Sequence, residues 1–244
     1  MSALRLVSVN IERSKHLDLV VPFLKAQQAD VVCLQECMER DIPLLKSVAG
    51  EHVLYTPLCV IVDRPNEPDG VYGQAIFSKS PFVSTLEEYY AGEYDPIPSH
   101  GNDKAESILR VARALSAVEI EKGGATYRIA TTHFTWSAEG APSETQREDL
   151  QKLLEILRPF PDLILTGDFN TPRGTEIFDA IAAKYRDNIP AKYTTSIYGP
   201  FHRAGPLPYM VDGLFSTLAY EVTDVELHSG VSDHCAITAS ISRK

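Results

Sequence analysis

Short apolar runs that end in polar residues recur along the chain and predict strands. Leu4–Val9 alternates apolar and polar positions and ends at Asn10, while Asp30–Leu34 is a short apolar run that ends at Gln35 and Glu36. The other segments of this kind are Val53–Val62, Val71–Ser78, Arg110–Ile120, Tyr127–Thr132, Asp162–Thr166, Met210–Phe215, Ala219–Leu227 and Ala236–Ile241. The pattern therefore predicts a protein rich in short strands.

Helical spacing of apolar residues appears in three segments between these strands. His16–Gln28 has one apolar face, which Pro22 interrupts early. Pro142–Leu157 is the clearest helix, with proline near its start and four leucines along one face. Thr175–Ala183 is the third predicted helix. Strands and helices alternate without an internal repeat, which indicates a mixed α/β chain.

Turn residues and long irregular stretches mark the loops. Residues 63–70 are dense in proline, glycine and acidic residues, and Gly73 predicts a further turn with Tyr72 and Gln74 on either side. The longest irregular segment is 89–105, and loops of this length in compact domains are usually functional or mobile. Since no composition shift divides the chain, we expect one domain over residues 1–244.

Composition and charge exclude several classes of protein. The 244 residues include 44% hydrophobic and 23% charged ones, which is typical of globular proteins and not of disordered or fibrous ones. No apolar run approaches the roughly 20 residues of a membrane-spanning helix, and Met1–Asn10 lacks the pattern of a signal peptide. We therefore expect a soluble cytoplasmic protein that does not associate with membranes.

The net charge and the cysteines limit the choice of partners. The 23 basic and 33 acidic residues give a formal charge of 23 − 33 = −10, which disfavours loose binding to extended nucleic acid. The four cysteines have no zinc-site spacing and are too few for a disulfide scaffold of a chain this long. We expect them to be small packing groups.

Carboxylates, amides and imidazoles recur where predicted strands stop. Side chains at strand ends can converge on one rim of a sheet. Oxygen-rich sets suit hard cations such as Mg²⁺, and imidazoles carry protons near neutral pH. A bound cation polarises a phosphoryl oxygen during displacement at phosphorus. The set therefore predicts a metal-dependent phosphoester hydrolase, with candidate catalytic residues Asn10, Glu36, His133, Asp168, Asn170, Asp212, Asp233 and His234.

Six short segments that contain these residues resemble, in order, the motif series of the endonuclease/exonuclease/phosphatase superfamily, whose members include deoxyribonuclease I and sphingomyelinases. The resemblance extends over essentially the whole chain and implies a four-layer α/β/β/α sandwich of two mixed β-sheets flanked by helices. The segments are Ser8–Asn10, Leu34–Glu36, Thr132–Phe134, Thr166–Asn170, Val211–Gly213 and Ser232–His234.

The resemblance also implies a metal site. Glu36 corresponds to the principal metal carboxylate, Asn10 assists at the metal or the phosphate, and Asp233 is a further carboxylate on the metal side. The implied cofactor is Mg²⁺, for which Mn²⁺ can substitute. Glu12 lies where one branch of the family has an acidic residue, so it is either a secondary metal ligand or a surface charge.

The remaining roles concern water and phosphate. By resemblance, Asp168 orients or deprotonates the attacking water, Asn170 holds the scissile phosphate, and His234 is the essential imidazole, oriented by Asp212. His133 corresponds to a second histidine that donates toward the phosphate; the alternative is a histidine that only packs in its strand, because the sequence names no carboxylate to orient it.

Four further residues are candidates for substrate binding. Arg113, in the middle of an apolar strand, either clamps a phosphate or pairs with a carboxylate of the sheet. Tyr72 lies beside the predicted turn, whereas His202 and Arg203 follow aromatic residues in a long loop. Aromatic and cationic side chains in alternation can stack a base or a sugar and hold a phosphate, but the aromatic residues can equally pack the loops down.

Three functions are compatible with these residues. The one we expect is a phosphodiesterase or nuclease acting on DNA or RNA. The first alternative is a phosphatase or phosphodiesterase acting on a small or lipid-linked phosphate, such as an inositol phosphate or a sphingomyelin-like headgroup. The second is a non-catalytic binding protein with the same fold, which is disfavoured because every catalytic position holds a competent residue. A monomer is the expected oligomeric state.

Overall fold

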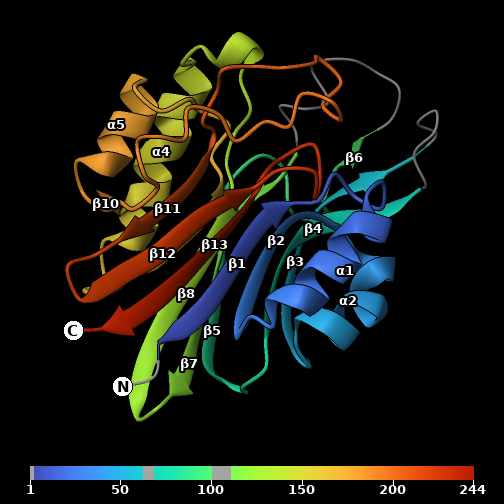
Figure 1. Ribbon diagram of the computed structural model, residues 1–244. Coiled ribbons are helices and arrows are strands. Elements are labelled where there is room, and N and C mark those ends of the chain that lie inside the picture. Colours follow the sequence, from blue (N-terminus) through green and yellow to red (C-terminus); the bar gives the residue numbers. More distant parts are fainter. Residues whose placement is uncertain (1–2, 63–68, 101–110) are drawn as a thin grey trace.

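Two β-sheets pack face to face, and helices cover the outer face of each, so the chain has the expected four-layer α/β/β/α architecture (Figure 1). The computed structural model describes residues 3–62, 69–100 and 111–244. The two termini lie at the same end of the sandwich (Figure 1). In the described part of the chain, no helix combines the length and the apolar character needed to cross a membrane.

The first sheet has seven strands, and its central pair, β1 and β2, is parallel while most other neighbours are antiparallel. In this pair Asn10 lies opposite Gln35, so both strands deliver polar residues to one end of the sheet. The spatial order of the strands is β12 (Tyr220–His228), β13 (Ala236–Arg243), β1 (Leu4–Asn10), β2 (Val31–Met38), β4 (Gly70–Ser78), β3 (His52–Ile61) and β6 (Ser99–His100).

The second sheet has six strands and repeats this design, because its parallel pair, β8 and β9, is also central. Here His133 lies opposite Asp168 at the carboxyl ends of the two strands. The order is β10 (Arg186–Asp187), β11 (Asp212–Ser216), β9 (Ile164–Asp168), β8 (Ala125–His133), β7 (Arg113–Lys122) and β5 (Phe82–Ala91).

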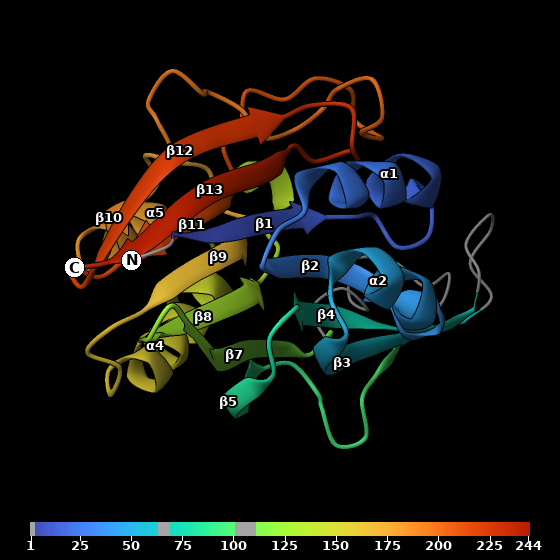
Figure 2. The same cartoon turned by 60° about the horizontal axis from the view of Figure 1, so that its bottom comes forward.

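Alternation along the strands separates the core into layers. In β1, Leu4 and Leu6 belong to the core between the sheets, whereas Val7 and Val9 belong to the core beneath the helices. The helices α1 (Leu17–Gln27) and α2 (Ile42–Ala49) cover the first sheet, and α4 (Glu144–Leu157) and α5 (Glu176–Ala182) cover the second (Figure 2). Two short 3₁₀ segments are η1 (Glu39–Asp41) and η2 (Ala138–Gly140). Each apolar face is thus buried against a neighbouring layer.

The predicted helices form, with one correction. Helix α1 continues through Pro22 instead of being interrupted by it. Pro22 is exposed, so water can satisfy the carbonyl of Asp18 that loses its hydrogen-bond partner. The start of α4 is well defined, because the Ser143 hydroxyl accepts from the Gln146 N–H and the Gln146 side chain accepts from the Ser143 N–H.

The loop predictions needed larger corrections. The segment 89–105 was expected to be irregular, but Tyr89–Ala91 ends strand β5 and Ser99–His100 forms β6. Residues 101–105 lie outside the described residues, as do 63–68 and Arg110. Strand β5 and helix α2 were not predicted. The predicted turn at Gly73 is wrong, since Gly73 lies inside β4, where a Cβ would approach the Thr56 carbonyl oxygen to 2.1 Å. Only glycine fits there, because another backbone passes so close.

Candidate active site

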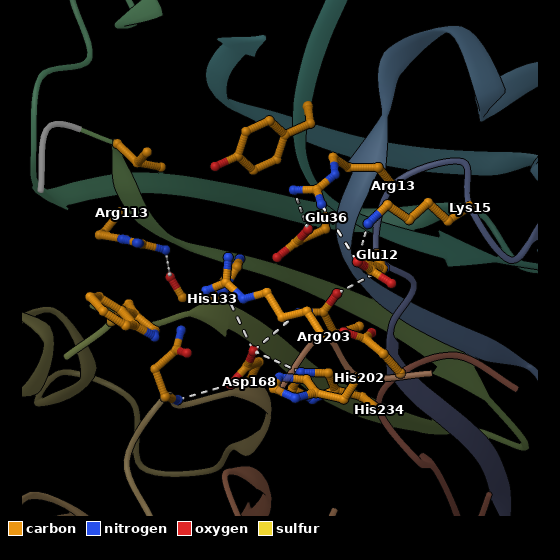
Figure 3. Close-up of a pocket in the computed structure, with 16 residues that line it drawn as sticks. Glu12, Arg13, Lys15, Glu36, Arg113, His133, Asp168, His202, Arg203 and His234 are labelled. Atoms are coloured by element: carbon orange, nitrogen blue, oxygen red, sulfur yellow. Dashed lines mark hydrogen bonds and ion pairs between the residues drawn. The ribbon is translucent and has the colours of Figure 1, made fainter. Parts of the chain in front are cut away.

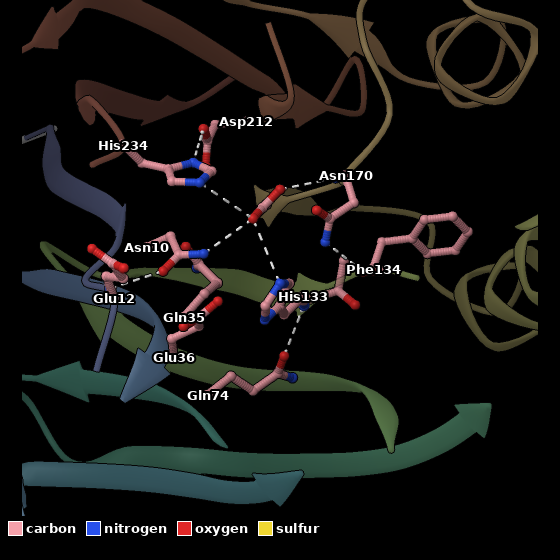
Figure 4. Close-up of polar contacts among 12 residues, drawn as sticks. Asn10, Glu12, Gln35, Glu36, Gln74, His133, Phe134, Asn170, Asp212 and His234 are labelled. Carbon is pink, nitrogen blue, oxygen red and sulfur yellow. Dashed lines mark hydrogen bonds and ion pairs between the residues drawn. The ribbon is translucent and has the colours of Figure 1, made fainter. Parts of the chain in front are cut away.

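Polar side chains from both sheets meet at the ends of the two parallel strand pairs. The Asn10 amide nitrogen, at the end of β1, lies 3.1 Å from Oδ2 of Asp168, at the end of β9 (Figure 4). This hydrogen bond crosses from one sheet to the other, and both side chains are buried. The structure therefore brings together residues that are 158 positions apart in the sequence.

Asp168 is the centre of the cluster. Its carboxylate is 1% exposed, and its Oδ1 accepts the Asn170 backbone N–H at 2.9 Å. Its Oδ2 lies 3.5 Å from His133 Nε2 and 3.8 Å from His234 Nε2. A carboxylate between two imidazoles, with its orientation set by a backbone donor, can orient a water molecule or take a proton from it.

His234 and Asp212 form a hydrogen-bonded pair beside Asp168. The Nδ1–Oδ2 distance is 2.7 Å, and the pairing of β11 with β9 sets Asp212 directly opposite Asp168. Burial lowers the pKa of His234, but the charges of Asp212 and Asp168 outweigh it and raise this pKa well above its usual value. The raised pKa favours the form of His234 with a proton on each ring nitrogen, and Nε2 lies on the side of Asp168.

Ser196 supports this pair and was not identified from the sequence. Its hydroxyl oxygen accepts the backbone N–H groups of Val211 and Asp212, each at 3.1 Å. Its carbonyl accepts the Cys235 N–H at 2.7 Å. Because the serine lies in a long loop before β11, no motif marks it, and only the folded chain shows that it fixes both sides of the Asp212–His234 pair.

Glu36 owes its position to an irregularity in β2. The pairing of β2 with β4 shifts register between Leu34 and Cys37, and Glu36 has a left-handed φ of 53°. Such a bulge re-aims a side chain, and Glu36 lines the same pocket as Asp168. Burial raises the pKa of Glu36, but the positive charge of Arg13, whose Nη1 lies 3.1 Å from Oε2, and the site histidines lower it to about 2.

The carboxylates near Glu36 fit a divalent cation. Burial and the neighbouring Glu12 and Glu36 raise the pKa of Asp233 to about 6, although His234 acts in the opposite direction. Ligand atoms of Glu12, His16 and Asp233 lie within 4.8 Å of one another. Buried acidic oxygens that destabilise one another's charge form the kind of donor set that a hard cation stabilises.

A second cluster of possible ligand atoms and the contacts of Asn10 also concern the predicted metal site. The second cluster of ligand atoms within 4.8 Å contains Asp168, Asp212 and His234, of which Asp212 and His234 already share a hydrogen bond. The Asn10 amide divides its contacts, since its nitrogen meets Asp168 and its oxygen accepts the Glu12 N–H at 3.1 Å. Asn10 thus links the metal side of the site to the Asp168 side.

Asn170 is held in a fixed orientation at the start of the loop after β9. It has a left-handed φ of 50°, and its amide donates to the Phe134 carbonyl at 2.8 Å. Gln146, at the start of α4, donates to the Asn170 carbonyl at 3.2 Å. The Asn170 amide has a second N–H, and Asn170 lines the pocket.

Asp168 is the carboxylate beside Nε2 of His133, and Gln74 takes part in positioning the His133 backbone. The His133 backbone N–H donates to Gln74 Oε1 at 2.9 Å, while Nδ1 of the imidazole is buried without a hydrogen-bond partner. Burial lowers the pKa of His133 to about 4, so its imidazole is neutral at neutral pH. Gln74 is fully buried and also donates to Ser116, so it does not contact substrate as a residue beside a turn would.

The predicted substrate residues line a single pocket with the catalytic ones (Figure 3). Its volume is about 190 Å³. Arg113 and Tyr72 are 4% and 7% exposed, whereas His202 and Arg203 come from the loop before β11. Arg113 does not pair with a sheet carboxylate among the described residues; it donates to the His133 carbonyl at 3.1 Å. All twelve predicted site residues therefore lie in or directly behind one pocket.

Comparisons with known proteins concern the family and the fold of the chain. Residues 7–234 match the profile of the Endonuclease/Exonuclease/phosphatase family. No curated protein matches the sequence significantly. An endonuclease/exonuclease/phosphatase from Beutenbergia cavernae is similar in structure, with a TM-score of 0.75 and 20% identity, over 100% of this chain and 72% of that one.

Two structures with more specific names are also similar. The human Nocturnin catalytic domain with bound sulfate has a TM-score of 0.72 and 18% identity, over 100% of this chain and 94% of that one. A mannosyl-6-phosphatase from Bacteroides thetaiotaomicron has a TM-score of 0.69 and 15% identity, over 98% and 99% of the two chains. At these identities, the likeness shows a shared fold.

Proposed function

The chain belongs to the endonuclease/exonuclease/phosphatase family, and on that premise we propose that it is a Mg²⁺-dependent phosphoester hydrolase. The observation that carries the proposal is the position of Asp168. Its buried carboxylate lies between His133 and His234 and accepts a hydrogen bond from Asn10 of the opposite sheet. This arrangement suits activation of water beside a phosphate.

The proposed metal ligands are Glu36 and Asp233, with Asn10 assisting and Glu12 next to them. Glu36 is ionised throughout the neutral range, because its pKa lies near 2. When bound, the metal supplies a positive charge that polarises the phosphoryl group. Mg²⁺ suits these oxygen donors, and Mn²⁺ shares the preference for carboxylate and water ligands.

The other residues act on water, phosphate and leaving group. Asp168 orients the water and accepts its proton as the oxygen attacks phosphorus. His234, held by Asp212, donates from Nε2 to the phosphoryl or leaving oxygen. The Asn170 amide and neutral His133 donate hydrogen bonds to the phosphate. All these contacts strengthen as negative charge develops in the in-line displacement, which is how they accelerate the reaction.

The proposal is tested by measuring turnover of p-nitrophenyl phosphate and bis-p-nitrophenyl phosphate with Mg²⁺, before and after chelation by EDTA. We expect chelation to abolish hydrolysis and added Mg²⁺ or Mn²⁺ to restore it. Full activity in the presence of the chelator would refute the metal-dependent mechanism. No hydrolysis of any phosphoester, with folded protein and bound metal, would instead favour the binding-protein alternative.

A compact phosphoester is the substrate class that the pocket supports best. A cavity of about 190 Å³ accommodates a phosphate and a small part of its ester group. The net charge of −10 disfavours an extended polyanion. The mannosyl-6-phosphatase from Bacteroides thetaiotaomicron, which shares the fold, is named for a compact phosphoester. A sugar phosphate therefore belongs in the test panel.

Nucleic acid, the substrate class expected from the sequence, is the second candidate because of an aromatic group at the rim. Phe201 is 38% exposed and stacks on His16, with ring centroids 4.9 Å apart. Its neighbours His202 and Arg203 line the pocket. An exposed ring beside cations can stack an unpaired base. Turnover of single-stranded DNA or RNA, in a panel with inositol and sugar phosphates, separates the two candidates.

A further inference from the structure

Arg113 is a buried cation that forms no ion pair within the part of the chain that the structure describes. Arg113 is 4% exposed, and its Nη1 donates to the uncharged carbonyl of His133 at 3.1 Å. A charge removed from water is costly unless an opposite charge compensates it. The position of Arg113 in the pocket lining therefore suits an anion that enters the pocket.

Two buried carboxylates of the described structure, Asp149 and Asp168, have hydrogen-bond partners other than Arg113. Asp149, also buried, accepts from the Thr135 hydroxyl at 2.6 Å and lies 3.7 Å from Nζ of Lys152. Asp168 is occupied by Asn10 and the two histidines. These contacts leave Arg113 as a guanidinium that faces the pocket beside His133 (Figure 3).

The cations on the other side of the pocket are, in contrast, paired with acids. Arg13 lies 3.1 Å from Glu36, and Lys15 contacts Glu12. Figure 3 shows Arg13 and Lys15 together on the side opposite Arg113. Among the described cations that line the pocket, Arg113 is thus buried and forms no ion pair, whereas Arg203 is exposed to water.

We propose that Arg113 binds the reacting phosphoryl group and makes the pocket selective for compact phosphomonoesters over phosphodiesters. The inference rests on the proposed function and names its substrate class. A diester phosphate carries a single negative charge, whereas a monoester carries between 1.5 and 2 at about pH 7. The additional charge of the monoester matches the additional cation. A planar guanidinium also pairs with two phosphate oxygens at once, and Arg113 retains donors after its bond to His133.

The test compares wild type with Arg113→Gln on p-nitrophenyl phosphate and bis-p-nitrophenyl phosphate, at saturating Mg²⁺. We expect wild type to prefer the monoester. Arg113→Gln should lower kcat/KM for the monoester by about 10- to 100-fold, the range for one charge-assisted hydrogen bond, and change that for the diester by less than about threefold. Arg113→Lys, which keeps the charge without the fork, should recover part of the loss.

Arg147→Gln is the matched control, because Arg147 lies on the surface of α4 and pairs with Glu144 and Glu176. Its kinetics should equal those of wild type. Equal losses on both esters in Arg113→Gln would overturn the proposal, since the arginine would then support the site generally. Unchanged kcat/KM for p-nitrophenyl phosphate in Arg113→Gln would also overturn it, because the arginine would then not bind the reacting phosphoryl group.

Binding of inorganic phosphate separates this inference from the proposed function. Titration calorimetry with Mg²⁺ present should show phosphate binding to wild type and weakening of at least about tenfold in Arg113→Gln. This result holds even if neither ester is hydrolysed, in which case the proposed function fails and the phosphate site remains. Unchanged phosphate affinity in a folded Arg113→Gln variant would refute the role of Arg113.

Discussion

Replacing Asp168 with asparagine tests the centre of the proposed mechanism with little change in shape. Asparagine can keep the hydrogen bond that Oδ1 accepts from the Asn170 N–H at 2.9 Å. It removes the negative charge that lies 3.5 Å from His133 and 3.8 Å from His234. Its amide nitrogen would then face the Asn10 amide nitrogen, which now donates to Oδ2 at 3.1 Å. The variant therefore loses both the proton acceptor and one link between the sheets.

The expected effect is large and falls on kcat. Loss of one positioned acid–base group lowers turnover by about 10²- to 10⁴-fold, which corresponds to roughly 3–5 kcal/mol in the activation free energy. KM should change much less, because Asn170 and Arg113 still hold the phosphate. A loss of kcat with KM preserved is the signature of an interaction used mainly in the transition state.

The assay is the initial rate of p-nitrophenyl phosphate hydrolysis at saturating Mg²⁺, accompanied by thermal unfolding of each variant. Asp224→Asn is the control, because Asp224 is exposed in β12 and asparagine tolerates its left-handed φ of 52°. It should retain wild-type kcat. A folded Asp168→Asn variant with kcat within about threefold of wild type, far from the loss expected of an acid–base group, would refute the role assigned to Asp168.

Three further changes test the metal side, the histidine pair and the scaffold. Glu36→Gln should raise the Mg²⁺ concentration for half-maximal activity by at least about tenfold, and an unchanged metal titration would exclude Glu36 as a ligand. Asp212→Asn should lower kcat at least about tenfold, because the neutral amide no longer supplies the negative charge that stabilises protonated His234; wild-type kcat would contradict this. Asp162→Asn should lower the free energy of unfolding by about 1–2 kcal/mol at pH 7 without changing kcat. Burial raises the pKa of Asp162, but hydrogen bonds and charge from Arg243 and Arg128 outweigh it and lower the pKa. Denaturant titrations should therefore show the difference in unfolding free energy between wild type and Asp162→Asn vanishing as the pH falls below about 4. A constant difference down to acidic pH would refute the charge-based explanation.

The sequence predicted which polar residues meet at one end of the sandwich, because most of them follow regular strands. Asn10 and Asp168 come directly at the ends of strands, and strand direction alone places such residues on a rim. Glu36 is different, because its orientation depends on a bulge that no local pattern announces. The family motif predicted the residue, and only the folded backbone shows how it points into the pocket.

The missed elements have weak local signals. Strand β5 is at the edge of its sheet and mostly exposed, so its polar residues obscure the alternation that marks a half-buried strand. Helix α2 has only eight residues, too few for a clear helical period. Gln74 was expected beside a turn, but its partners Ser116 and His133 are over 40 positions away, and this distance hides its role in the core.

The change along β1 from apolar to polar explains why the site forms at this end of the sandwich. Leu4 and Leu6 face the opposite sheet as part of the core, but Ser8 and Asn10 continue the same face with polar groups. Buried polar groups require partners, and here the opposite sheet supplies them. Gln35 donates to Thr131 at 2.9 Å across the gap, one step behind the bond from Asn10 to Asp168. The same contacts that satisfy the polar end of the core therefore set the two halves of the active site in register.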